Sequence, residues 1–254
     1  MSMQKKSDVK IPTIVIIRII VFLFIGFILF WFYSRTRDFL TTAPMFNVKE
    51  VMWDQSISFM DPKPLNELKG QNIFRVDLVK LHQRISNKYP QISQLSVVRQ
   101  LPDRIEVLAK KRDILLQLVA HNKFLIVDTE GVTMFYTGSP VPFPVVRGIP
   151  IEKSRIVLGA PSTSKELNLV VDLLRQLKSH PHTSRLRVMS IEAGNLSKIQ
   201  LLVMPNIQII IDQDSLAAKV DMLEILFQNG KINWGQVKYI DIRFKEPIIN
   251  ENVP

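Results

Sequence analysis

Residues 70–78 read GQNIFRVDL, and this short stretch is predicted to form the corner at which one helix ends and the next begins. Gly70 ends the first helix, because glycine readily adopts the left-handed conformation that follows a helix. Asp77 caps a second helix over residues 78–88, since its carboxylate can accept hydrogen bonds from the free amides of the first turn. A ligand loop with Asn72 and Asp77 as its polar ligands is the alternative interpretation.

The segments on either side of this corner complete a small unit of mixed α and β structure. Alternation of side chains from Phe46 predicts a strand, and the first helix opens at Pro64. Pro90 ends the second helix. Two further strands are predicted over residues 92–100 and 104–112, joined by a tight LPD connection. The predicted order is therefore β-α-α-β-β.

A second folded unit begins with a hairpin over residues 124–135, FLIVDTEGVTMF, with Gly131 in its turn. Residues 141–150, VPFPVVRGIP, are too rich in proline for a central strand. Residues 163–166, TSKE, form a capping box that starts a helix. Apolar residues then recur at helical spacing, so that this helix has one buried face.

The remainder of the second unit is predicted to alternate strands with one more helix. Strands are expected at RVMSIEA, LSKIQLLV and IQIIID. Asp214 is expected to cap a helix that ends at Asn229 and Gly230. The last strand covers residues 236–245, QVKYIDIRFK. The fold class is α+β.

Residues 13–33, TIVIIRIIVFLFIGFILFWFY, predict a transmembrane helix. They contain no acidic residue and one basic residue, Arg18. At about 1.5 Å per residue their length matches one hydrocarbon core, and Trp31 and Tyr33 suit a membrane interface. The run is too long, and its end too aromatic, for a cleaved signal peptide.

The charge distribution around this helix predicts its orientation. Lys5, Lys6 and Lys10 precede the helix, whereas Arg35 and Arg37 follow it. The positive-inside rule then places residues 1–12 in the cytoplasm as a short tail and the bulk of the chain on the other side. Residues 34–44 are interpreted as a linker.

The composition excludes several classes of chemistry. The chain of 254 residues has no cysteine, which excludes disulfides, zinc–thiolate sites, iron–sulfur clusters and a cysteine nucleophile. Its net charge of +10 suits an anionic polymer, anionic lipid or nucleic acid. It has no stripe of interleaved basic and aromatic residues and no zinc-finger spacing, so no nucleic-acid partner is expected.

The order of these motifs resembles that of the FtsQ/DivIB family of bacterial cell-division proteins. The run from Leu65 to Leu78 resembles the start of the family's POTRA domain, and YPQISQLSVVRQLPDRIEVLAKKR (residues 89–112) resembles its end. The VD-x-x-G hairpin, the proline-rich loop ending in Gly148 and the terminal YIDIRF resemble the family's β domain. One departure follows Arg112, where the family usually has Arg-x-Pro-x-Ala.

The resemblance implies a domain organisation and a function. A POTRA domain would cover residues 45–113, a β domain 114–249 and a C-terminal tail 250–254. The protein would be a single-pass protein of the cell (inner) membrane, located at the division septum. It would act as a non-enzymatic scaffold that recruits and regulates FtsB/FtsL-type partners and, through them, septal peptidoglycan synthesis. Other division proteins would bind the POTRA domain.

The resemblance also places the partner site on the last strand, as an edge to which FtsB adds a strand. An edge strand presents unpaired amides and carbonyls to another chain. Alternation places Ile240, Ile242 and Phe244 on one face, and Pro247 is expected to interrupt the row of donors. The corresponding residues are Tyr239, Ile240, Asp241, Ile242, Arg243, Phe244, Lys245, Glu246, Ile248 and Ile249.

Candidate catalytic residues are few. His180 and His182 flank a proline with no carboxylate nearby in the sequence, so neither a metal nor another cofactor is expected. Asp128, Glu130 and Asp241 are carboxylates of the kind that hydrolyse glycans, but Asp241 is better explained by an ion pair with Arg243. The alternative function is therefore an anchored envelope enzyme or binding protein acting on peptidoglycan. A POTRA-bearing export protein is a further, less favoured interpretation.

Overall fold

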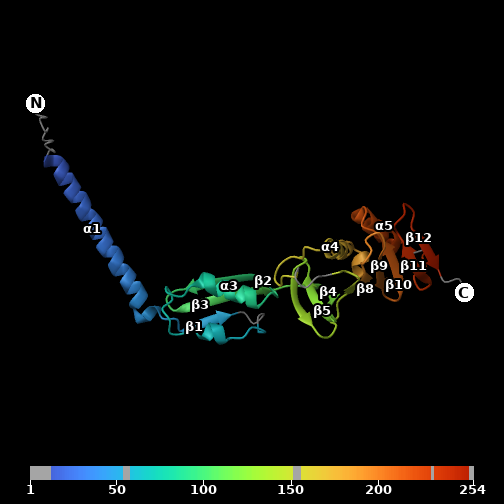
Figure 1. The fold of residues 1–254 in the computed structure, drawn as a ribbon, viewed down its shortest axis with the longest axis horizontal. Coiled ribbons are helices and arrows are strands. Elements are labelled where there is room, and N and C mark those ends of the chain that lie inside the picture. The colour runs from blue at the N-terminus through green and yellow to red at the C-terminus, as the bar shows by residue number, and fades with distance from the viewer. Residues whose placement is uncertain (1–12, 54–57, 151–155, 230–231, 252–254) are drawn as a thin grey trace, which may run out of the picture. The chain divides into compact units, whose positions relative to one another are not determined.

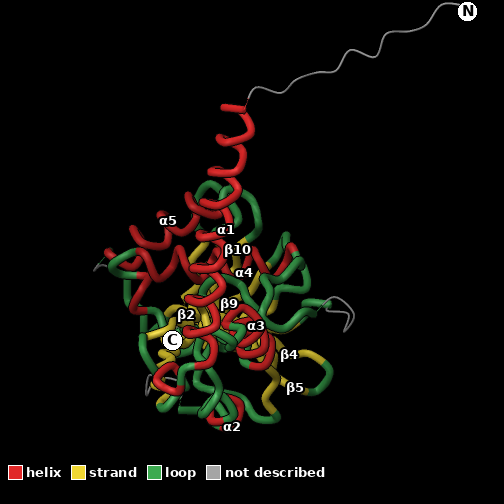
Figure 2. Tube along the Cα trace, turned by 90° about the vertical axis from the view of Figure 1, so that its left-hand side faces the viewer, coloured by secondary structure: helices red, strands yellow, loops and turns green. Residues whose placement is uncertain are grey.

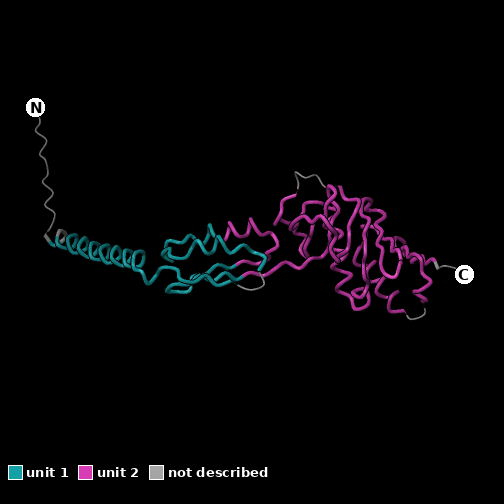
Figure 3. Tube along the Cα trace, turned by 90° about the horizontal axis from the view of Figure 1, so that it is seen from below, with its two compact units in different colours: residues 1–81, 96–108 teal, residues 82–95, 109–254 magenta. Residues whose placement is uncertain are grey.

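The computed structural model describes residues 13–53, 58–150, 156–229 and 232–251 (Figure 1). The chain divides into two compact units, residues 1–81 with 96–108 and residues 82–95 with 109–254 (Figure 3). This division passes through a helix and two strands of the predicted β-α-α-β-β segment, so the predicted domain boundary after residue 113 stays a prediction. The predicted α+β class is confirmed.

Helix α1, Thr13–Thr42, is longer than the predicted span, and it continues through residues 34–42, which the sequence analysis assigned to a linker. Among the described residues, one helix is long and apolar enough to cross a membrane, judged by length and composition. Its 30 residues extend for about 45 Å. No proline or glycine interrupts residues 34–42, and the helix therefore ends only before Pro44.

The stretch GQNIFRVDL forms a turn that is followed by a capped helix, as predicted for a corner between two helices and not for a ligand loop. Gly70 has the expected positive φ, 84°. The first helix, α2, covers only Lys63–Asn66, so Gly70 lies in the turn that follows and does not end the helix as predicted. The amide of Lys80 donates to Asp77 at 3.1 Å, and this bond lowers the pKa of the Asp77 carboxyl. The Asn72 side chain is also engaged, because it donates to the Leu40 carbonyl and accepts from the Phe74 amide. The polar groups proposed as ligands are thus used by the fold.

Arg99 of strand β2 (Ile92–Gln100) also stabilises this corner through hydrogen bonds. Its guanidinium donates to the carbonyl of Ile73 at 2.9 Å and to that of Val76 at 2.7 Å. These carbonyls lie in a segment without regular pairing, and a buried carbonyl without a partner is costly. Arg99 therefore replaces hydrogen bonds that the corner cannot make within itself.

The first sheet has three strands in the order β1-β3-β2, with β1 parallel to β3. The predicted first strand begins later than expected: Phe46 closes a short 3-10 helix, and pairing starts only at Glu50. Its alternation also fails, since Val48 and Val51 are both buried. The elements of this segment are β1 (Glu50–Trp53), α2 (Lys63–Asn66), α3 (Leu78–Lys88), β2 (Ile92–Gln100) and β3 (Arg104–Lys111).

The second sheet has nine strands in the order β12-β11-β10-β9-β8-β7-β4-β5-β6. The hairpin of β5 and β6 and the strands β8, β9 and β10 are formed as predicted. The strands are β4 (Ile114–Ala120), β5 (Lys123–Asp128), β6 (Thr133–Thr137), β7 (Val145–Arg147), β8 (Val188–Glu192), β9 (Ile199–Val203), β10 (Ile207–Ile211), β11 (Val237–Asp241) and β12 (Ile248–Glu251).

Strand β7 corrects the prediction that residues 141–150 cannot supply a central strand. It pairs in parallel with β4 on one side and with β8 on the other. The three residues of β7 contain no proline, and the nearest ones, Pro144 and Pro150, lie outside it. Each residue of β7 therefore has an amide to donate. Because the strand is only three residues long, it fits between the two prolines and can pair on both sides.

Helices α4 (Lys165–Ser179) and α5 (Leu216–Gln228) pack beside each other on one face of this sheet (Figures 1 and 2). Both predicted caps lie one residue later than expected. Ser164, not Thr163, caps α4 and accepts from the Leu167 amide. The N-cap of α5 is Ser215, whose side chain makes no cap bond. The predicted apolar face of α4 is buried: Leu167, Val170, Val171, Leu174 and Leu177.

Candidate protein-interaction strand at the C-terminus

The predicted last strand, residues 236–245, ends early at Asp241, and a further strand, β12, follows it to form a hairpin. β11 pairs in parallel with β10, and β12 pairs antiparallel with β11, with Ile240 opposite Ile249 and Asp241 opposite Ile248. Strand β12 comes first in the strand order, so among the described strands it has a neighbour on one side only. At this end of the sheet the edge is therefore β12 and not β11.

The turn between the two strands explains why a single strand was predicted wrongly. The Ile242 amide still bonds the Ile210 carbonyl, as in a strand. The next amide, that of Arg243, turns back to the Asp241 side chain at 3.1 Å. An aspartate that accepts from the backbone two residues later favours a turn. The chain leaves the sheet there and returns after Pro247.

The hairpin distributes the predicted site residues over three environments. Tyr239, Ile240 and Asp241 lie in β11. Phe244 is 54% exposed whereas Ile242 is fully buried, so the predicted common face of these two residues is wrong. Residues 243–246 form the loop. Ile248 and Ile249 lie in β12, together with two residues that were assigned to the C-terminal tail, Asn250 and Glu251.

Pro247 has a role opposite to the predicted one. It was expected to interrupt the row of donors, but it lies in the loop immediately before β12. Proline is well tolerated just before or at the start of an edge strand. The pattern of one proline followed by two isoleucines was the available sign that a new strand begins there.

An ion pair fixes the turn. The Arg243 guanidinium donates to both carboxylate oxygens of Asp241, at 2.7 Å to Oδ2 and 3.0 Å to Oδ1. This pairing lowers the pKa of the Asp241 carboxyl. Arg243 also lies 5.5 Å from the centre of the Phe244 ring. The expected Asp241–Arg243 pair is confirmed, and the exposed Phe244 ring lies next to its guanidinium.

The histidines do meet carboxylates, contrary to the sequence interpretation. Both partners come from α5, distant in the sequence: His180 Nε2 lies 3.0 Å from Asp221, and His182 Nδ1 lies 2.6 Å from Glu224. Desolvation tends to raise the pKa of Glu224, but bonds from the amide of Thr183 and from the ring and amide of His182 outweigh it. They lower this pKa to about 2.

His180 makes the stability of this region depend on pH. Its two ring nitrogens face acceptors, the Gln176 carbonyl and Asp221, and both can donate only in the charged ring. These bonds raise the pKa of His180. The stability that His180 contributes to the folded protein is therefore complete below its pKa in the unfolded chain, roughly 6.5. It disappears as the pH rises through the higher pKa of the folded protein.

We expect His180→Gln to remove this dependence. Thermal unfolding measured from about pH 5.5 to about pH 8.5, that is from roughly one unit below to roughly two units above the unfolded value, should show the parent losing stability with rising pH relative to the variant. Asp221→Asn should reduce the same slope. An unchanged slope in both variants would show that the ring is not charged in the folded protein.

The other candidate carboxylates belong to a structural ion pair. Asp128 is buried and accepts from Arg112 at 2.7 Å, and Glu130 is exposed and pairs with the same guanidinium at 3.1 Å. A catalytic carboxyl needs access to a substrate, which the buried Asp128 lacks. In the described ranges, no group of three or more histidine, aspartate or glutamate side chains is arranged to hold a metal ion.

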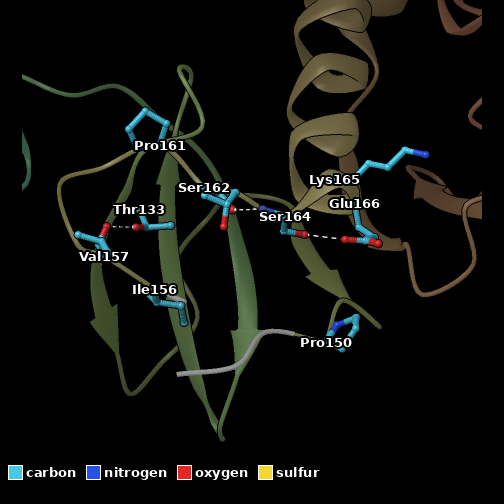
Figure 4. Close-up of a pocket in the computed structure, with 10 residues that line it drawn as sticks. Thr133, Pro150, Ile156, Val157, Pro161, Ser162, Ser164, Lys165 and Glu166 are labelled. Atoms are coloured by element: carbon cyan, nitrogen blue, oxygen red, sulfur yellow. Dashed lines mark hydrogen bonds between the residues drawn. The ribbon is translucent and has the colours of Figure 1, made fainter. Parts of the chain in front are cut away.

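A small cavity of about 160 Å³ lies beside the start of α4 (Figure 4). Its polar side chains bond one another or the backbone: Ser164 donates to Glu166 at 2.8 Å, and Thr133 donates to the Val157 carbonyl at 2.9 Å. Bonds from its own amide and from Ser164 lower the pKa of Glu166. Ser164 thus caps the helix and bonds Glu166, and the Thr133 hydroxyl is bonded to the backbone.

Comparisons with known proteins include a likeness in structure to a bacterial cell-division protein. No protein-family model matches the chain, and no curated protein matches it. A solved structure of the major extracytoplasmic domain of the bacterial cell-division protein DivIB, trans isomer, from Geobacillus stearothermophilus, is 10% identical. The match covers 49% of this chain and 99% of that one, with a TM-score of 0.29.

Proposed function

We propose that the chain is a non-enzymatic, single-pass membrane scaffold of the bacterial division machinery and that an FtsB/FtsL-type partner adds a strand to β12. The observation that carries the proposal is the edge position of β12, which has β11 on one side and no other strand of the described sheet beyond it. An edge of this kind is a template for a strand of another chain.

The side chains around this edge suit a protein partner. Ile248 is 48% exposed on β12 and Phe244 is 54% exposed on the preceding loop. Exposed apolar side chains beside free backbone groups provide affinity and specificity together, since the backbone supplies hydrogen bonds and the side chains fill pockets. Aromatic anchors such as Phe244 are enriched where interfaces gain most of their energy.

Further parts of the proposal rest on the sequence motifs. The β-α-α-β-β segment is the second surface for division proteins. Helix α1 anchors the chain in the bilayer with its N-terminus in the cytoplasm, at the division septum. Through its partner the protein regulates septal peptidoglycan synthesis.

Two proline substitutions test the edge directly. Successive amides of a strand point to opposite sides, so that one of Ile249 and Asn250 donates toward β11 and the other toward the free edge. We expect the proline variant at the free-edge position to keep the stability of the parent and to bind co-purified FtsB and FtsL at least about tenfold more weakly. The other variant should lose stability in the hairpin.

Binding should be measured with the full-length chain in lipid nanodiscs, with thermal unfolding in parallel. Phe244→Ala provides a second variant, which removes the anchor and leaves every backbone group in place. If the stable proline variant and Phe244→Ala both bind as the parent does, the partner does not use β12.

A further inference from the structure

A groove of about 530 Å³ lies at the centre of the second sheet, between the C-terminal turns of α4 and the start of β8. Buried leucines of β4 and α4 form its floor, and exposed Met189 and Met204 form part of its rim. Its lining residues are Leu115, Pro142, Phe143, Pro144, Leu174, Leu177, Lys178, Thr183, Ser184, Leu186, Arg187, Val188, Met189 and Met204. The volume is within the range of sites that hold a ligand or several side chains.

One wall of the groove is held rigidly. The fully buried side chain of Gln117 donates to the carbonyls of Val141 and Phe143 and accepts from the Val141 amide at 3.0 Å. The segment Pro142–Phe143–Pro144 therefore has little freedom to lose. A wall that is ordered in advance lowers the entropic cost of binding.

The opposite rim can adapt its shape. Met189 lies where the register between β8 and β9 shifts, so that it has no pairing partner there, and Met204 follows β9. Their side chains are 47% and 45% exposed. Methionine is flexible and polarizable, and it is used at surfaces that accept varied apolar side chains.

The charges of the groove have one sign. Lys178 and Arg187 line it, and none of its lining residues is acidic. Within the described part of the chain neither of the two side chains makes a hydrogen bond or an ion pair. Two cations that have no partner among the described residues, on a groove with apolar lining, complement a ligand that is apolar and anionic.

We propose that this groove binds a segment of a partner protein that combines apolar side chains with a carboxylate. A protein segment fits better than a lipid, because the groove opens to solvent and carries the polar Thr183 and Ser184, whereas an acyl chain needs an enclosed apolar site. The strands that line the groove are β4 and the start of β8, together with Met204 after β9, and β4 and β8 lie away from β12 in the strand order. It is a further docking surface, separate from the β-α-α-β-β segment, and it does not depend on the proposed edge-strand partner.

The methyl groups of Met189 and Met204 report on this groove directly. The full-length chain in neutral lipid nanodiscs, labelled at its methionine methyl groups, is titrated with a short synthetic peptide of leucine and glutamate. We expect the NMR signals of Met189 and Met204 to shift while that of the buried Met134 does not. A counterpart peptide with lysine in place of glutamate should bind at least roughly tenfold more weakly.

Charge reversal provides the matched test. In Lys178→Glu with Arg187→Glu the preference should invert, so that the lysine peptide binds more tightly than the glutamate peptide. Lys110→Glu with Lys111→Glu changes the same charge on exposed residues of β3 and should leave the affinity within about twofold. Because the outcome is read at the two methionines, failure of the β12 test does not affect it.

Three results would overturn the proposal. The first is the absence of any shift at Met189 and Met204. The second is an equal affinity of the two peptides, which would leave the cations without a role. The third is a shift produced by phosphatidylglycerol vesicles and not by the glutamate peptide, which would assign the groove to a lipid.

Discussion

Gly148→Ala is expected to destabilise the second unit by at least about 2 kcal/mol. Gly148 has a φ of 81°, in the left-handed region that side chains disfavour. A Cβ there would lie 2.7 Å from the Gly194 amide nitrogen and 1.9 Å from the Glu192 carboxylate. The glutamate can move aside, but Gly194 meets the Cβ with its backbone, and the neighbouring Ala193 amide is bonded to the Arg147 carbonyl. The strained φ and the close contact with the Gly194 backbone therefore both lower the stability of the variant.

Two other glycines separate these contributions. Gly131 has a similar φ of 79° but meets nothing closer than 3.6 Å, so Gly131→Ala reports strain alone and should cost about 1 kcal/mol. Gly138 has no atom within 4 Å, and Gly138→Ala should change the free energy of unfolding by less than about 0.5 kcal/mol. Chemical denaturation of the three variants ranks them. If Gly148→Ala is as stable as Gly131→Ala, the backbones of Gly148 and Gly194 do not approach closely in the folded protein.

The elements that depend on interactions between residues close in the sequence were predicted correctly. The Asp77 cap, helix α3 and strand β2 depend on neighbouring residues, and their bounds agree with the structure. Gly70 and Gly131 were expected to take positive φ, and both do. In each case the residue type itself limits the backbone.

Features that depend on partners far away in the sequence were missed. Strand β7 is central because β4 and β8 are its partners, and nothing within residues 141–150 indicates them. The histidine partners lie 41 and 42 residues away on α5. The last strand was predicted only in part: β11 lies within residues 236–245, but the turn at Asp241 and Arg243 ends it and a further strand, β12, follows, which alternation alone does not reveal.

Asp128→Asn should be the most destabilising change of one charge, costing about 2–4 kcal/mol. One oxygen of Asp128 accepts from the amides of Glu130 and Val132, both at 2.8 Å. The other accepts from Arg112, and the two side chains are only 2% and 11% exposed. In asparagine the second oxygen becomes an NH₂ group, which cannot accept from the guanidinium. A buried cation then loses its nearest carboxylate.

Glu130→Gln removes the same charge from the same guanidinium and serves as the matched control. Glu130 is 69% exposed, and water replaces its interaction at little cost, so the change should be below about 0.5 kcal/mol. Arg112 also donates to the Pro90 carbonyl at 3.1 Å, and the loss in Asp128→Asn should therefore extend to the residues after α3. Hydrogen exchange of the Arg112 amide, which bonds the Gln91 carbonyl, can measure this loss of stability. Equal stability of the two variants would mean that burial does not decide the strength of this pair, and that the two amides of the turn hold Asp128 without help from Arg112.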